Sequence, residues 1–390
     1  MHINFFNFAQ TKNRIEFSFS TEDEEGRIFF ELSRDVAVTS DKVALALSTL
    51  CGRKYKKINY ELIISEPVFD EIVAFTLAEV SCLGKLKDRM TISHQNHIED
   101  ESDTVVLNFS GGFDSLAAKY LMPADTKLVS MDFGGRFSRE KEFFTNFDTY
   151  SVSTNLLETG LRKNSWSFMG IGSILYSDVL NSKYYSFGGI LEASSSNFHV
   201  NPVAALNRSF PPFESAGMKN APYVLGLTEI GTIKVIANSA PHILMDSLDS
   251  LANPGEEKRY RKQVLLDIYC SLSGKAINYN KVPKPVRPHF KFGQNFSLDF
   301  LALYVAKFAG IEVAQHTVSE IPCEVVKTFE SHSFDFYEKL NTKMIENFPK
   351  QLIGDFMLKL RSVGIDVYNS DDWKEFYSVR DYLGKYHEIR

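Results

Sequence analysis

Residues 105–115 read Val-Val-Leu-Asn-Phe-Ser-Gly-Gly-Phe-Asp-Ser, and this stretch decides the fold. Its first five residues predict a buried strand, and a helical pattern follows the glycines as far as Met122. Two adjacent glycines between a strand and a helix let backbone N–H groups approach an oxyanion, while the helix directs its positive dipole end at the same point. The sequence therefore predicts a phosphate site whose binding residues are Ser110, Gly111, Gly112 and Ser115.

Asp114 places a carboxylate inside this phosphate loop. The carboxylate would repel phosphate unless a divalent cation or a nearby base compensates, so we expect Mg²⁺ with Asp114 as its ligand. The loop matches neither Gly-x-x-x-x-Gly-Lys-Ser/Thr nor Gly-x-Gly-x-x-Gly, which argues against a Walker A loop and against a dinucleotide site.

The chain around the loop alternates short apolar runs with helical patterns. Strands are expected at 105–109, 128–133, 150–152 and 184–187, with helices at 139–147 and 166–180 between them. Such βαβ units predict an α/β domain, an open parallel sheet with flanking helices, over residues 104–310. Residues 311–390 are expected to be mainly helical.

Residues 1–95 are expected to form a small α+β domain. Two alternating stretches, 15–19 and 28–32, flank an acidic turn and predict a hairpin, and a helix, a strand and a further helix beginning at Pro67 follow. The polar segment 93–103 is the predicted linker, and we interpret its two histidines, His94 and His97, as solvated.

Composition excludes several classes of protein. Among 390 residues 44% are hydrophobic and 24% charged, as in an ordinary globular chain, and the net charge of −6 does not favour nucleic acid as a partner. No apolar run is long enough for a membrane span and the first residues do not resemble a signal peptide, so we expect a cytoplasmic protein with no membrane partner. The four cysteines are far apart and show no metal-binding spacing.

Residues 110–115 match the Ser-Gly-Gly-x-Asp-Ser signature of the PP-loop ATP pyrophosphatases. Over about residues 104–270 the chain resembles the 7-cyano-7-deazaguanine synthase (QueC-like) branch of that superfamily, whose relatives also occur in anti-phage systems. The resemblance is carried by Asp132-Phe133-Gly134-Gly135 with Glu140, by Phe187-Gly188-Gly189 with Glu192, and by the region of Pro254-Gly255-Glu256-Glu257.

The resemblance implies an adenine nucleotide alpha hydrolase-like fold that binds ATP. It further implies cleavage of ATP between its α and β phosphates, with Ser110 and Asp114 as catalytic residues, so that a substrate carboxylate or amide oxygen is adenylated. A nitrogen nucleophile then displaces AMP. The acceptor is a small molecule or a protein. The alternative is a non-catalytic ATP-binding scaffold subunit of a multi-protein complex, for example an anti-phage one, which the additional terminal regions and the 32 phenylalanines favour.

The chain departs from the QueC-like branch at its metal site. Residues 254–263 read Pro-Gly-Glu-Glu-Lys-Arg-Tyr-Arg-Lys-Gln where that branch carries zinc-binding cysteines, so zinc is not expected and the nitrile-forming reaction is not implied. The cations of this stretch, Lys258, Arg259, Arg261 and Lys262, are predicted on a helix. They either hold a phosphate or a carboxylate or form a solvated face.

Other polar residues follow the expected strands. Asp132 and Gly134 would lie beside the phosphate loop, because ligands bind beyond the carboxyl ends of parallel strands, and the resemblance implies contact with the nucleoside; alternatively Asp132 only caps the next helix. Gly188 permits close approach of a flat ligand, with Glu192 and Ser194 as hydrogen-bonding groups, unless this is an ordinary surface loop. Glu229 is a weaker candidate of the same kind.

Overall fold

The chain folds into two compact units, seen in the computed structural model that describes residues 1–90, 103–250, 252–253 and 255–389. Unit 1 contains Met1–Ser110, Ala124–Ser186 and Ser209–Ala221, and unit 2 contains Gly111–Pro123, Phe187–Arg208 and Pro222–Arg390. Most of the predicted linker, with His94 and His97, lies outside the described residues. The predicted domain limits at 95, 104 and 310 stay predictions.

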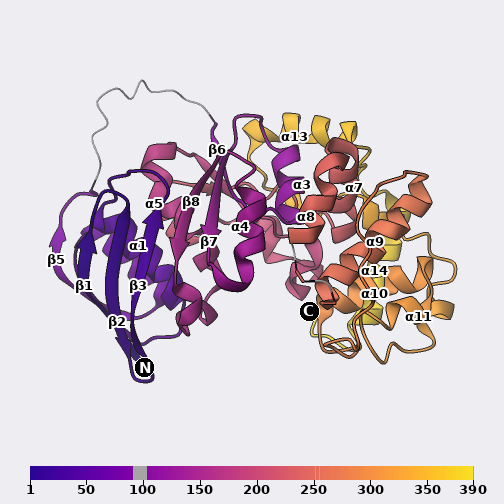
Figure 1. The fold of residues 1–390 in the computed structure, drawn as a ribbon, viewed down its shortest axis with the longest axis horizontal. Coiled ribbons are helices and arrows are strands. Elements are labelled where there is room, and N and C mark those ends of the chain that lie inside the picture. Colours follow the sequence, from indigo (N-terminus) through magenta and orange to yellow (C-terminus); the bar gives the residue numbers. More distant parts are fainter. Residues whose placement is uncertain (91–102, 251, 254, 390) are drawn as a thin grey trace. The chain divides into compact units, whose positions relative to one another are not determined.

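Unit 1 is built on one ten-stranded sheet (Figure 1) in the order β10-β9-β6-β7-β8-β3-β2-β1-β4-β5. The strands are β1 His2–Gln10, β2 Arg14–Thr21, β3 Glu25–Leu32, β4 Lys57–Ser65, β5 Glu79–Leu86, β6 Val105–Asn108, β7 Lys127–Asp132, β8 Thr149–Thr154, β9 Tyr184–Ser186 and β10 Lys219–Asn220. The α/β class and a mostly parallel sheet are confirmed. The sheet is not parallel throughout, because β8-β3, β3-β2 and β2-β1 are antiparallel pairs.

The predicted hairpin is the pair β2–β3. Phe17 lies opposite Ile28 and Ile15 opposite Phe30, and all four side chains are buried on one face. The hairpin is continuous with the βαβ strands, because β3 pairs with β8. Local alternation predicts a hairpin but carries no information about a partner more than a hundred residues away.

Helices cover the sheet of unit 1. They are α1 Ser40–Cys51, α2 Glu66–Thr76, α4 Ser138–Phe144, α5 Ile171–Leu180 and α6 Pro211–Ser215. Thr39 caps α1 by accepting the N–H of Lys42, and Pro67 lies in the first turn of α2 as predicted. On α5, a Cβ added to Gly172 would lie 2.7 Å from Val129 Cγ1, so glycine lets this helix pack closely on β7.

Unit 2 is mainly helical. Its helices are α3 Phe113–Leu121, α7 Glu229–Ser239, α8 Leu244–Ser250, α9 Glu257–Ser273, α10 Phe296–Phe308, α11 Ile311–Ala314, α12 Val325–Thr328, α13 Lys350–Ser362 and α14 Ser370–Leu383. Aromatic side chains fill its core: the ring centroid of Phe198 lies 5.1 Å from that of Phe300 and 5.0 Å from that of Phe376. The expected helical carboxyl-terminal region is confirmed. Within the described ranges no helix has the length and apolar character needed to cross a membrane.

Candidate functional site

The loop of residues 110–115, predicted to bind phosphate, turns at Gly111 and runs into α3. Gly111 has φ of 80°, in the left-handed region that favours glycine, and Gly112 is the N-cap residue of α3. Two hydroxyls hold the glycine carbonyls: Ser115 Oγ donates to Gly112 O at 3.0 Å, and Ser247 Oγ from α8 donates to Gly111 O at 2.8 Å. The loop therefore enters the helix in a fixed conformation.

Gly188 packs against the first turn of α3. A Cβ added to it would lie 2.8 Å from the backbone nitrogen of Ser115, whereas a Cβ on Gly189 would meet nothing within 4 Å. Gly188 therefore approaches the backbone of Asp114 and Ser115, and the predicted approach of a flat ligand stays a prediction. Any side chain at this position would push on the segment that carries Asp114.

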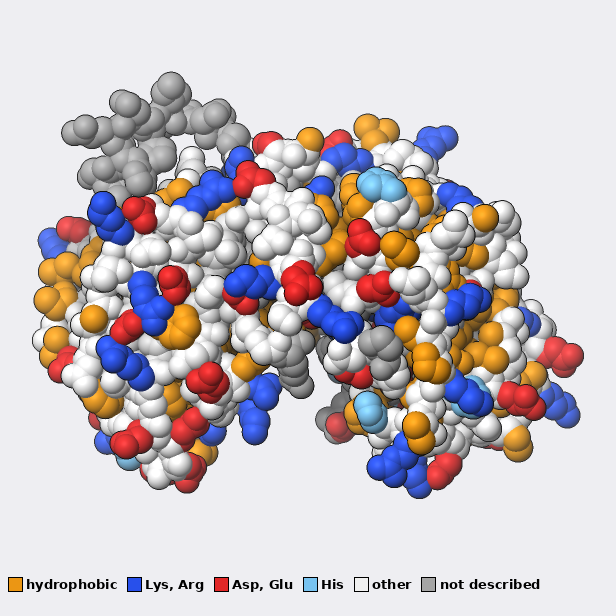
Figure 2. Space-filling model, viewed as in Figure 1, with side chains coloured by type: hydrophobic (Ala, Val, Ile, Leu, Met, Phe, Trp, Pro, Cys, Tyr) orange, Lys and Arg blue, Asp and Glu red, His pale blue; other side chains and the backbone are white. Residues whose placement is uncertain are grey.

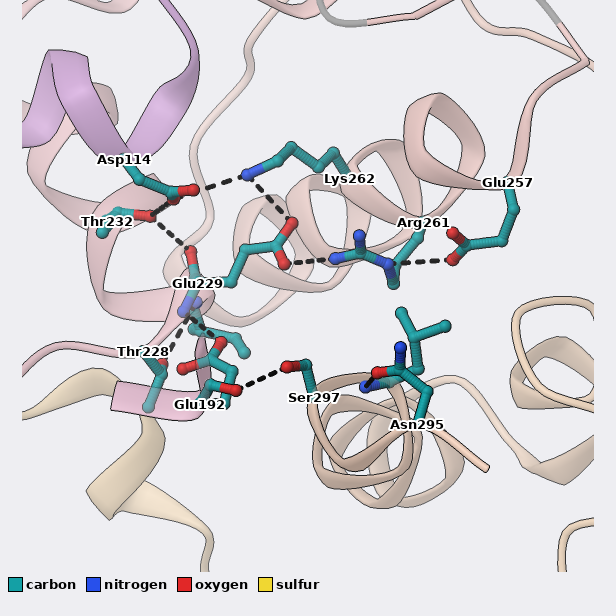
Figure 3. A network of polar contacts seen from close by, with 12 residues as sticks. Asp114, Glu192, Thr228, Glu229, Thr232, Glu257, Arg261, Lys262, Asn295 and Ser297 are labelled. Atoms are coloured by element: carbon teal, nitrogen blue, oxygen red, sulfur yellow. Dashed lines mark hydrogen bonds and ion pairs between the residues drawn. The ribbon is translucent and has the colours of Figure 1, made fainter. Parts of the chain in front are cut away.

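Asp114 is held through one carboxylate oxygen (Figure 3). Its Oδ1 lies 3.0 Å from Thr232 Oγ1 on α7 and 3.4 Å from Lys262 Nζ on α9. Its Oδ2 has no hydrogen-bond partner in the part of the chain that the structure describes, and 29% of the side chain is exposed. The second oxygen is accordingly open to a ligand.

Lys262 brings a buried cation to this carboxylate. Its Nζ also lies 3.0 Å from Glu229 Oε1, and the residue is only 2% exposed. Burial by itself lowers the pKa of Lys262, but the charges of Asp114 and Glu229 raise it above the ordinary value. The ammonium therefore stays charged. The alternative of a solvated face is wrong for Arg259 and Lys262, which are both buried.

Glu229 accepts from a second cation as well. Arg261 Nη1 contacts Glu229 Oε2, and Arg261 Nε lies 2.9 Å from Glu257 Oε1. Burial raises the pKa of Glu229, but the attraction of Arg261 and Lys262 is larger and lowers it below the ordinary value. Glu229 is thus an ionised carboxylate between two cations. On the helix predicted to carry a basic cluster, Arg261 and Lys262 therefore pair with carboxylates instead of facing solvent.

Glu192 joins the same cluster in another protonation state. The residue is 1% exposed, and its Oε1 accepts the backbone N–H of Glu229 at 2.8 Å (Figure 3). Burial, reinforced by repulsion from Glu229, raises the pKa of Glu192 to about 8. At neutral pH its carboxyl is therefore protonated, and its Oε2 has no hydrogen-bond partner among the described residues.

The structure brings some predicted residues into this cluster and leaves others out. Glu192 and Glu229, both weighed as candidates, lie together, whereas Ser194 pairs with Ser196 in an exposed turn at 2.7 Å. Thr232 and Ser247 were not predicted. Thr232 lies one helical turn after Thr228, the N-cap residue of α7. Nothing in the sequence relates Thr232 or Ser247 to Asp114.

Asp132, Gly134 and Ser110 belong to unit 1. Strands β6 and β7 are parallel neighbours, so Ser110 and Asp132 both follow strands that end at one edge of the sheet. Asp132 Oδ2 lies 2.7 Å from Lys141 Nζ and 2.9 Å from Ser153 Oγ. Burial raises the pKa of Asp132, but the hydrogen bonds from Lys141, Ser153 and the Gly134 N–H, together with the charge of Lys141, outweigh burial and lower it.

Asp132 also organises the turn that follows β7. Its Oδ1 accepts the N–H of Gly134 at 3.0 Å, and Gly134 has φ of 62°. Asp132 therefore fixes the turn that precedes the helical turn Gly135–Phe137, but the N-cap residue there is Gly134 and no side chain caps this turn, so the capping alternative is not borne out. A contact of Asp132 or Gly134 with the nucleoside stays a prediction.

The cluster around Asp114 suits a magnesium ion that arrives with a phosphate. In the described ranges, no group of three His, Cys, Asp or Glu side chains is arranged to hold a metal ion. Mg²⁺ with a nucleotide commonly takes one or two protein carboxylates and completes its shell with phosphate oxygens and water. The open Oδ2 of Asp114 meets that requirement.

Comparison of the chain with protein-family models, with curated proteins and with solved structures gave no significant match.

Proposed function

We propose that the protein binds Mg·ATP at the loop Ser110–Ser115 and cleaves it between the α and β phosphates to adenylate an acceptor. The observation that carries this proposal is the convergence of Asp114 and buried Lys262 at the first turn of α3. Three groups stabilise the charges of a magnesium pyrophosphate in this proposal. They are the N-terminus of α3, a carboxylate with one open oxygen and a desolvated cation.

Each group has a distinct role in the proposal. Ser110, Gly111, Gly112 and Ser115 bind the phosphates through the loop and the positive end of α3. Asp114 Oδ2 binds Mg²⁺. Lys262, whose Asp114 contact is long at 3.4 Å, donates to the departing pyrophosphate while Glu229 keeps the ammonium in place.

We propose that β9-β6-β7-β8 and their helices form an adenine nucleotide alpha hydrolase-like sheet, with Asp132 and Gly134 facing the nucleoside. The acceptor is a carboxylate or amide oxygen of a small molecule or a protein. A nitrogen nucleophile then displaces AMP and leaves a carbon–nitrogen bond, as in a QueC-like ligase.

The test follows the products of ATP. The full chain is incubated with Mg²⁺, α-labelled ATP, ammonia and candidate acceptors, and we expect AMP and pyrophosphate in equal amounts. Release of ADP and phosphate alone would overturn the proposal. Saturable ATP binding without AMP under any condition would instead support the scaffold alternative.

A further inference from the structure

The segment between α9 and α10 has a charge unlike the rest of the chain. From Gly274 to Leu298 there is no Asp or Glu, whereas the chain as a whole has a net charge of −6. The segment carries five cations: Lys275, Lys281, Lys284, Arg287 and Lys291. All five residues are exposed.

The middle of this segment repeats every three residues. Val282, Pro285 and Pro288 are buried or half-buried, and the cations that precede each of them, Lys281, Lys284 and Arg287, are all exposed. A period of three is that of a polyproline II helix, which the prolines favour, but the chain bends at Val286, Arg287 and His289. Lys281 and Lys284 therefore belong to the stretch before the bend, and Arg287 lies in the bend itself. We call residues 281–289 the cationic strap.

Unit 2 holds the cationic strap in place through α9. Gln263 accepts the N–H of Val282 at 2.7 Å and donates to its carbonyl at 3.3 Å, while Arg259 donates to Asn280 O at 2.6 Å. Pro285 is buried against the unit. The cations therefore lie on an ordered backbone. Binding a partner would cost little conformational entropy of this chain.

The existing contacts of the strap are easily exchanged. Lys281 pairs with Asp267 at 3.1 Å, but 69% of the lysine side chain is exposed. Lys284 Nζ lies 3.2 Å from His316 Nε2. Arg287 has no ion-pair partner within the described ranges. Exposed ion pairs contribute little to stability, so carboxylates of another molecule can replace them.

We propose that the cationic strap docks an extended acidic segment of a partner protein, with carboxylates spaced to meet Lys281, Lys284 and Arg287. This goes beyond the proposed reaction and does not depend on it. The exposed edge next to the cations carries Pro283 and the fully exposed Val286, which offer apolar contact between the charged pairs. Arginine together with apolar side chains is typical of protein interfaces.

The charges on one face of the molecule favour protein over nucleic acid. On the face shown in Figure 2, Asp and Glu side chains are interspersed with Lys and Arg, without a broad basic surface. A nucleic acid carries a dense row of phosphates and needs many cations over a wide area. A narrow row of three cations in a chain of net charge −6 suits a short acidic peptide better.

The experiment uses the full chain and labelled probes. The acidic probe is a fluorescent peptide of roughly 12 residues with Glu at every third position and Leu and Gly between, and two comparison probes are the same peptide with Lys for Glu and an oligothymidylate of roughly 20 nucleotides. We expect saturable binding of the acidic peptide that weakens as salt rises from about 50 to about 300 mM. The lysine peptide should not bind.

Matched variants identify the surface. The pair Lys284→Glu and Arg287→Glu should weaken binding of the acidic peptide at least about tenfold, and Val286→Asn should weaken it without a change of charge. The pair Lys327→Glu and Lys350→Glu, equally exposed on α12 and α13, should leave it unchanged. All these positions are exposed, so circular dichroism should show every variant folded.

Three outcomes would overturn the proposal. One is the absence of saturable binding of the acidic peptide. Another is an equal effect of the two charge-reversal pairs, which would indicate unspecific attraction. The third is tighter binding of the oligothymidylate that is lost with Lys284→Glu and Arg287→Glu, which would make the strap a nucleic-acid contact.

Discussion

Lys262 Nζ lies 3.4 Å from Asp114 Oδ1, although 148 residues separate the two in the chain. The lysine is buried and the aspartate is partly exposed, so the cation reaches the carboxylate from the inner side of the site. The ammonium of Lys262 thus compensates the charge of Asp114, and Asp114 Oδ2 has no hydrogen-bond partner among the described residues.

Removing the cation should destabilise the fold. Lys262→Met leaves Asp114 and buried Glu229 without their shared partner, and breaking a buried pair costs about 3 to 5 kcal/mol. Urea unfolding measures the loss. Lys258→Met on the same helix is the control, because Lys258 is exposed and should change stability little. Equal stability of the two variants would show that the Lys262 pairs contribute nothing.

Removing the charge of Asp114 should act mainly on the reaction. Asp114→Asn keeps an oxygen to accept from Thr232 but loses the negative charge that Mg²⁺ requires. We expect AMP formation to vanish, while the unfolding midpoint falls less than in Lys262→Met because Glu229 still pairs with Lys262. Asp125→Asn, an exposed aspartate, serves as the control. Full AMP formation by Asp114→Asn would remove the metal role.

Two neighbouring glycines offer a matched comparison. Gly188→Ala places a Cβ 2.8 Å from Ser115 N, where only backbone can give way, whereas Gly189→Ala enters open space. We expect Gly188→Ala to lose about 1 to 3 kcal/mol of unfolding free energy and to weaken ATP binding. Gly189→Ala should do neither. Similar behaviour of the two in urea unfolding and ATP titration would contradict the packing of Gly188 on the loop.

Glu192 should make stability depend on pH. Its pKa of about 8 when folded exceeds the ordinary 4.5, so between these values the folded chain binds one more proton than the unfolded chain. The free energy of unfolding contributed by this group therefore falls as pH rises from about 5 to about 8, by roughly 5 kcal/mol at most.

Glu192→Gln tests this directly, since glutamine does not titrate but can still accept the N–H of Glu229. Its unfolding free energy should fall less than that of the original chain over the same pH interval, and Glu346→Gln, an exposed glutamate, should follow the original chain. Parallel pH profiles for the original chain and Glu192→Gln would mean that Glu192 is ionised in the folded protein.

Several secondary-structure elements follow from local sequence patterns alone. The apolar run at 105–109, the paired glycines and the helical pattern after them gave β6, the turn at Gly111 and α3, and alternation gave the hairpin β2–β3. Hydrophobic periodicity and turn residues are properties of neighbouring residues in the chain. One short stretch is therefore enough to predict a strand, a turn or a helix. Strands β1 and β5 were not predicted. The side chains of β5 are mostly exposed, so its residues show little apolar alternation.

Which distant groups meet depends on how the elements pack in three dimensions. The tertiary structure joined the hairpin to the parallel strands through β3 and β8, and it left Lys258 of α9 exposed while Lys262 faces Asp114 and Arg261 faces Glu229. It also gave Glu192 and Glu229 opposite protonation states. The physical reason is that charge, burial and pKa depend on what surrounds a group in space, and packing of α3, α7 and α9 sets those surroundings.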